Sequence, residues 1–190
     1  MKLKKCNAVL ALASVFFGLV HIGYSAFAYL AFYYNPTLKM LTAIPFLAAV
    51  CLHAVLGMLL VFLQGDGTRL SMYPRLNKGT VAQRVTAALI FPLLIVHLNT
   101  FSLLQKSAAA GNWFGFALVL IAQVLFYIIV DAHIVTSFTK ALITLGALSS
   151  EKMRKTVDRI VWIVGAALLL FALFAILKTE LAMFVPGGAA

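Results

Sequence analysis

The residues with the clearest chemical potential in this sequence are its four histidines, His21, His53, His97 and His133. Each lies in a different long apolar stretch, and none lies in the polar segments between these stretches. Imidazole nitrogens bind transition metals, and they also relay protons or pack as hydrogen-bonded polar groups. Because ionisable residues are costly inside a bilayer, one histidine per stretch with none elsewhere favours metal ligation over packing or relay roles.

The composition shows what kind of elements must position these histidines. Of the 190 residues, 64% are hydrophobic and 11% are charged, and the mean hydropathy is +1.05. A soluble domain carries about 25% charged residues, so this composition predicts an integral membrane protein. The net charge of +10 does not indicate nucleic-acid binding, because the basic residues form short clusters between apolar stretches. Cys6 and Cys51 are isolated, which excludes a disulfide framework, a thiolate zinc site and an iron–sulfur cluster.

Five stretches are long enough to cross a bilayer, which takes about 20 apolar residues: roughly 7–34, 41–64, 81–105, 112–139 and 157–184. The predicted fold is an all-α membrane protein of five transmembrane helices, forming one domain over residues 1–190. The first stretch has the outline of a cleavable signal peptide. It continues through Phe32, however, so we expect it to remain as a span.

The basic residues predict the orientation of the spans. Twelve lysines and arginines fall at the ends that share a side with the N-terminus, and three fall on the other side. The three are Lys39, Lys106 and Lys178. Because cytoplasmic loops carry the excess of lysine and arginine, we expect the N-terminus in the cytoplasm and the C-terminus outside.

Depth in the bilayer sorts the histidines into two pairs. At 1.5 Å per residue, His21 and His97 each lie about 22 Å from the cytoplasmic boundary of their spans. His53 lies about 16 Å and His133 about 10 Å from the same boundary. The sequence therefore predicts an outer pair, His21 with His97, and an inner pair, His53 with His133.

Two separated pairs of histidines suit haem better than zinc. Zinc takes three or four protein ligands, and no carboxylate or thiolate joins either pair. Haem iron needs only two axial ligands, and the absence of a CxxCH motif indicates b-type haem. We therefore expect two b haems stacked across the membrane. Arg75, Arg84 and Lys140 fall near the inner boundary and would neutralise haem propionates there, although the positive-inside pattern alone also accounts for them.

Asp131 is the only acid that the predicted boundaries place well inside a span. It precedes His133 by two residues, about 200° around the helix, so it points away from the haem expected on His133. A carboxyl group in this environment favours proton transfer, the alternatives being a hydrogen bond to another helix or an ion pair.

Several short motifs resemble the dihaem cytochrome b membrane anchor of succinate:quinone oxidoreductases, in particular the five-helix anchor of epsilonproteobacterial-type quinol:fumarate reductases. Gln83-Arg84-Val85-Thr86 followed by His97 is similar to the Gln-x-x-Thr and His of the family's third span. Asp131-Ala132-His133 is similar to its acid-x-His on the fourth span, and Glu151-Lys152-Met153-Arg154 to the basic start of its fifth. The resemblance covers most of residues 7–184, and the histidine layout is its most specific part.

The resemblance implies the same histidine pairing and a location in the bacterial cytoplasmic membrane. It also implies menaquinone or another quinone as substrate, and two soluble partners on the cytoplasmic face: an iron–sulfur subunit and a flavoprotein that interconverts succinate and fumarate. This chain has no dinucleotide fingerprint, so it would carry electrons and leave dicarboxylate chemistry to its partners. Some family members place a glutamate near the outer end of the first span, whereas here no acid occurs between His21 and Asp66.

Two other functions are compatible with the sequence. A stand-alone transmembrane cytochrome b reductase of the ferric or ascorbate type also uses four membrane histidines. A haem-free transporter would use the histidines as proton relays. Subunits that co-purify would separate the first from the anchor, and a reduced-minus-oxidised spectrum would exclude the second.

Overall fold

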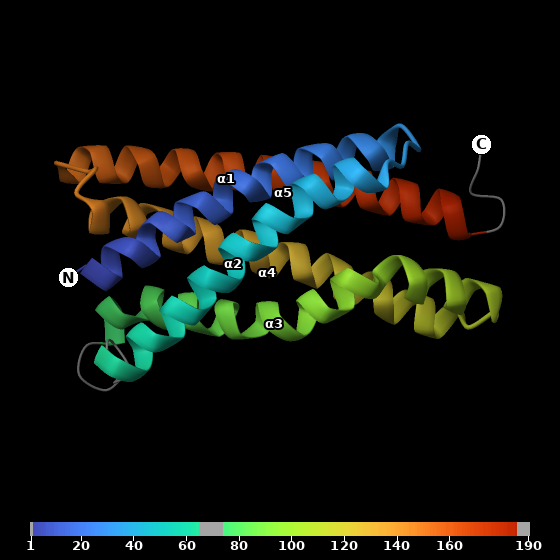
Figure 1. Ribbon diagram of the computed structural model, residues 1–190, viewed down its shortest axis with the longest axis horizontal. Helices are drawn as coiled ribbons and strands as arrows, with labels where there is room; N and C mark the ends of the chain where they lie inside the picture. The colour runs from blue at the N-terminus through green and yellow to red at the C-terminus, as the bar shows by residue number, and fades with distance from the viewer. Residues whose placement is uncertain (1, 65–73, 186–190) are drawn as a thin grey trace.

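The computed structural model of the chain describes residues 2–64 and 74–185 (Figure 1). These residues form five helices: α1 (Lys2–Leu30), α2 (Pro36–Gln64), α3 (Pro74–Ala109), α4 (Trp113–Leu145) and α5 (Glu151–Phe184). Each is long and apolar enough to cross a membrane, which confirms the predicted all-α class with five spanning helices. A helix of 33 residues, such as α4, is about 50 Å long against about 30 Å of hydrocarbon. The helices therefore extend beyond the apolar stretches recognised in the sequence.

The first helix is the exception, because it ends at Leu30 and not near residue 34. Phe32 has a positive φ of 50°, and the amide of Tyr33 donates a hydrogen bond of 2.9 Å to the carbonyl of Ala28. Asn35 then accepts a hydrogen bond of 3.1 Å from the amide of Leu38, directly before Pro36 opens α2. An Asn cap followed by Pro is a favourable helix start, and it outweighs the apolar character of the tyrosines before it.

Local capping also sets the other two described loops. Asn112 accepts a hydrogen bond of 2.9 Å from the amide of Gly115 at the start of α4, and Ser150 caps α5 through the amide of Met153 at 3.2 Å. Gly146 ends α4 with a φ of 80°, a left-handed conformation that favours glycine. These short loops make α3 and α4, and likewise α4 and α5, antiparallel neighbours.

The helices run along the long axis of an elongated bundle (Figure 1). The closest helix pairs are α1 with α2 and α3 with α4, while α5 packs on α4 and α1. Within the described residues, α2 packs closely only against α1. We call the end of the bundle that holds the N-terminus of α1 and the start of α5 the basic end, and the end that holds the α1–α2 loop the opposite end.

The contact between α4 and α5 depends on Gly165. A Cβ atom at this position would lie 2.5 Å from Cγ1 of Val135 and 2.8 Å from Oδ1 of Asp131. Both distances are shorter than any real carbon contact, so the absence of a side chain lets the helices approach here.

Candidate haem-ligand site

Each of the four histidines is held by a hydrogen bond at Nδ1. In the described part of the chain, none of the four rings makes a hydrogen bond at Nε2. The acceptors at Nδ1 are side-chain or backbone oxygens at 3.1–3.4 Å: Thr42 Oγ1 for His21, the Asn7 carbonyl for His53, Gln123 Oε1 for His97, and both Thr86 Oγ1 and the Gln83 carbonyl for His133. Carbonyl and amide oxygens only accept, so three of these rings must carry their proton on Nδ1. This leaves the lone pair on Nε2, which is the arrangement that metal-binding histidines use.

His53 on α2 and His133 on α4 form a ring pair. Their centroids are 6.4 Å apart and their planes are tilted by 60°. Two metal–nitrogen bonds of about 2 Å, with about 1 Å from each nitrogen to its ring centre, place two axial imidazoles about 6 Å apart. The structure therefore brings the predicted inner pair to the separation that a shared metal ion requires.

Gln83 and Thr86, the residues of the Gln-x-x-Thr motif, both contact His133. The Gln83 carbonyl and Thr86 Oγ1 each lie 3.1 Å from Nδ1 of His133. Thr86 donates its own proton to the carbonyl of Ala82 at 2.8 Å, so its oxygen is free to accept from the imidazole. One turn of α3 thus orients the histidine of α4.

His97 is held more rigidly than the other rings. Its ring stacks on Phe126 at 4.5 Å between centroids and meets the edge of Tyr127 at 5.7 Å. The amide oxygen of Gln123 accepts from Nδ1 of His97 at 3.1 Å and from the hydroxyl of Thr100 at 2.9 Å. Gln123 is buried. Its contact with His97 does not follow from the sequence, because a lone polar residue in an apolar stretch does not reveal which helix it faces.

His21 on α1 faces α2. Its ring lies 5.7 Å from that of Phe46 and close to parallel with it. Within the described residues, the rings of His21 and His97 make no contact with each other. The outer pair is therefore more widely separated than the inner pair.

The donor set of these pairs fits a haem iron. Among residues 2–64 and 74–185, no three histidine, cysteine, aspartate or glutamate side chains gather at one point. The rings of His53 and His133, which lie together, therefore offer two imidazoles without a further protein ligand, the number that an iron requires when a macrocycle fills its other four positions. Zinc would require further protein ligands.

The three basic residues predicted to bind propionates have different surroundings. Lys140 donates to the carbonyl of Gly79 at 2.9 Å and to Oε1 of Gln83 at 3.2 Å, which ties α4 to α3 next to His133. Arg84 is half-buried and makes no hydrogen bond within the described residues. The side chain of Arg75 lies outside the described residues. Arg84 thus has a guanidinium group available for an anion near the inner pair.

Asp131 and His133 face different helices, as their separation of about 200° predicts. The carboxyl group of Asp131 lies against the backbone of α5 at Gly165, whereas the ring of His133 contacts α3. Asp131 is half-buried and makes no hydrogen bond or ion pair within the described residues. Its carboxyl group is therefore unpaired in the described part of the chain.

Asp131 is not the only acid inside the bundle, because Glu180 near the end of α5 is completely buried. Its Oε1 accepts a hydrogen bond of 3.4 Å from the hydroxyl of Tyr29, and its Oε2 is buried without a partner in the described structure. The sequence does not single out this acid, which lies near the end of the fifth apolar stretch. The contact of α5 with α1 encloses it, and that packing is invisible in the sequence.

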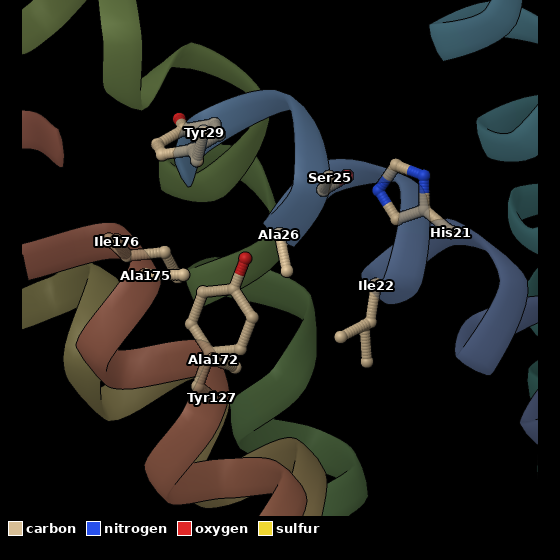
Figure 2. Close-up of a pocket in the computed structure, with 9 residues that line it drawn as sticks. All are labelled: His21, Ile22, Ser25, Ala26, Tyr29, Tyr127, Ala172, Ala175 and Ile176. Atoms are coloured by element: carbon tan, nitrogen blue, oxygen red, sulfur yellow. The ribbon is translucent and has the colours of Figure 1, made fainter. Parts of the chain in front are cut away.

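A small cavity lies between α1, α4 and α5, and Tyr29 lines it (Figure 2). Its volume is about 30 Å³, and His21, Tyr29, Tyr127 and Ala172 are among the residues that line it. This is room for about one water molecule and not for a macrocycle. The cavity is therefore distinct from the space that a haem would need.

Comparison with known proteins gives no relative: the chain matches no family model, no curated protein and no solved structure.

Proposed function

We propose that the chain is a membrane-anchor cytochrome b subunit that carries electrons through two b haems. His53 and His133 would bind one iron, and His21 and His97 the other. The observation that carries the proposal is the ring pair of His53 and His133, 6.4 Å apart, in which each ring is oriented through Nδ1. When bound, haem would supply reversible one-electron chemistry, and the chain would supply ligands, orientation and an apolar surrounding.

The electrons would pass between a membrane quinone, menaquinone or another, and two soluble subunits, an iron–sulfur protein and a flavoprotein that interconverts succinate and fumarate. Support for soluble partners comes from the basic end of the bundle, where Lys152 and Arg159 are exposed at the start of α5. A positive surface of this kind attracts an acidic partner. The excess of lysine and arginine at this end would place it in the cytoplasm of a bacterial cell, with the bundle in the cytoplasmic membrane.

The test of the proposal is a haem assay on the gently solubilised protein. Pyridine haemochrome analysis should give two b haems per chain. His21→Ala and His97→Ala should remove one spectral component, and His53→Ala and His133→Ala the other. A haem-to-chain ratio near zero would overturn the proposal. Loss of the same spectral component in His21→Ala and in His53→Ala would overturn the pairing of the histidines.

Asp131 would move protons during quinone turnover, since its carboxyl group lies against α5 and away from the histidine pair. Asp131→Asn keeps the shape of the side chain and removes the titratable proton. It should leave both haems bound and slow quinone-linked turnover more than turnover with an artificial electron donor. Loss of a haem would instead show that Asp131 supports His133.

A further inference from the structure

Gln123 of α4 is the only amide side chain that accepts a hydrogen bond from a histidine ring within the described residues. Its Oε1 lies 3.1 Å from Nδ1 of His97 on α3. The other three rings use backbone carbonyls or threonine hydroxyls. A carbonyl of the backbone does not change with the residue type, and a hydroxyl carries no charge, whereas one substitution turns an amide into a carboxylate or removes the acceptor. The surroundings of His97 therefore depend on the residue type at position 123.

The acceptor is enclosed in protein. The side chain of Gln123 is 2% exposed, so bulk water does not reach it. The hydroxyl of Thr100 lies 2.9 Å from the same Oε1 and 2.9 Å from the Val96 carbonyl, so its one proton is shared between two acceptors. An oxygen that serves two donors in a buried position is held more firmly than one with a single contact. This oxygen is thus the fixed point to which Nδ1 of His97 is directed.

The ring of His97 has little freedom to choose another acceptor. Phe126 stacks on it with 4.5 Å between the centroids and 18° between the planes. Tyr127 meets it at 5.7 Å with the planes 84° apart. Rotation of the imidazole would break both aromatic contacts, which favour these arrangements. Loss of the Gln123 oxygen would therefore leave the Nδ1 proton without a partner.

We propose that Gln123 is a positioning residue that sets the reduction potential of the haem on His21 and His97 by holding the proton of His97 on Nδ1. The presence of the haem rests on the proposed function, whereas the position of the proton does not. An acceptor at Nδ1 makes Nε2 a more basic ligand. A more basic ligand stabilises ferric iron over ferrous iron, so Gln123 lowers the potential of this haem.

Nitrogen NMR of the solubilised protein without haem, labelled with ¹⁵N-histidine, tests the positioning. The signals missing in His97→Ala identify this ring. In the wild type they should show the proton on Nδ1, and in Gln123→Leu a shift of the proton toward Nε2. Gln105→Leu is the matched control, because Gln105 is exposed at the opposite end of the bundle, and it should change nothing. A proton on Nε2 in the wild type, or an unchanged tautomer in Gln123→Leu, would overturn the positioning role.

Redox titration of the protein with haem tests the effect on the potential. The midpoint potential of the component that disappears in His97→Ala should rise in Gln123→Leu, which removes the acceptor, and fall in Gln123→Glu, which adds a negative charge. Each tenfold change in the preference for ferric over ferrous iron corresponds to about 59 mV. The haem on His53 and His133 should keep its potential in both variants. A residue that only fills space would not shift the potential in opposite directions.

Shifts of the same sign, or an unchanged potential in Gln123→Leu, would overturn the proposal. If Gln123→Leu does not fold, Gln123→Glu keeps the size of the side chain, and an unchanged potential in that variant would overturn it as well. A protein that binds no haem would overturn the proposed function and with it the effect on the potential. The NMR measurement would still decide whether Gln123 holds the proton of His97.

Discussion

At the residue scale, the chemistry of the four histidines depends on which ring nitrogen makes a hydrogen bond. All four rings use Nδ1 for a hydrogen bond to an oxygen, which assigns the lone pair of the best-defined rings to Nε2. Among the described residues, the four rings share a hydrogen bond at Nδ1 and make none at Nε2. This shared orientation agrees with the proposed metal ligation, which would use Nε2.

Gln123 is the residue on which the orientation of His97 depends most. Gln123→Leu should leave the Nδ1 proton of His97 and the hydroxyl of Thr100 without their shared acceptor. The expected loss is about 1–3 kcal/mol of unfolding free energy, the usual cost of an unsatisfied buried polar group. Unfolding in mixed micelles measures it, with the lipid-facing variant Ile121→Ala as the control. Equal stability of the two variants would contradict this role of Gln123.

At the element scale, the position of α5 depends on one close approach to α4. α5 carries no histidine, yet it contacts both α4 and α1 and encloses Glu180 between them. The approach at Gly165 brings the backbone of α5 against Val135 and Asp131. The fifth helix therefore adds an acidic group to the bundle as well as support.

Gly165→Ala should separate α4 from α5, because the new methyl group would lie within 3 Å of both Val135 and Asp131. Overpacking of this kind costs about 1–3 kcal/mol, measured as a loss of unfolding free energy. Gly57→Ala is the matched control, since a Cβ there meets nothing within 4 Å. If Gly57→Ala destabilised the protein as much as Gly165→Ala, helix propensity and not close packing would explain the effect.

At the scale of the whole molecule, charge is distributed unevenly between the two ends of the bundle. Lysine and arginine gather at the basic end, and Lys39, Lys106 and Lys178 are the basic residues of the other side. The described surface between the ends is dominated by exposed apolar side chains, which suits contact with lipid. A soluble partner would therefore meet the chain at the basic end.

Gentle solubilisation should recover this chain together with an iron–sulfur protein and a flavoprotein. Lys152→Glu combined with Arg159→Glu should weaken their retention, with increasing effect at low salt, because both side chains are exposed at the basic end. Lys106→Glu, exposed at the opposite end, is the control and should not change retention. A chain that is active alone and reduces ferric iron or oxidises ascorbate would instead be a stand-alone cytochrome b reductase.

The sequence by itself determined the five helices long enough to span a membrane, and it predicts a depth for each histidine. Apolar stretches of this length can satisfy their backbone in lipid only as helices, and the rise per residue then gives the depth. It did not determine that α1 ends at Leu30, because the positive φ of Phe32 and the Asn35 cap of α2 decide where the chain turns.

Only the tertiary structure decided which side chains face one another. Neither the partnership of Gln123 with His97 nor the enclosure of Glu180 by Tyr29 follows from spacing along the chain. In an almost uniformly apolar helix, no hydrophobic face marks the side that points inward, so rotation about the helix axis is set by contacts such as Gly165 against Val135. The depth of a residue is a local property of its helix, whereas the neighbours that its side chain meets depend on how all five helices pack together.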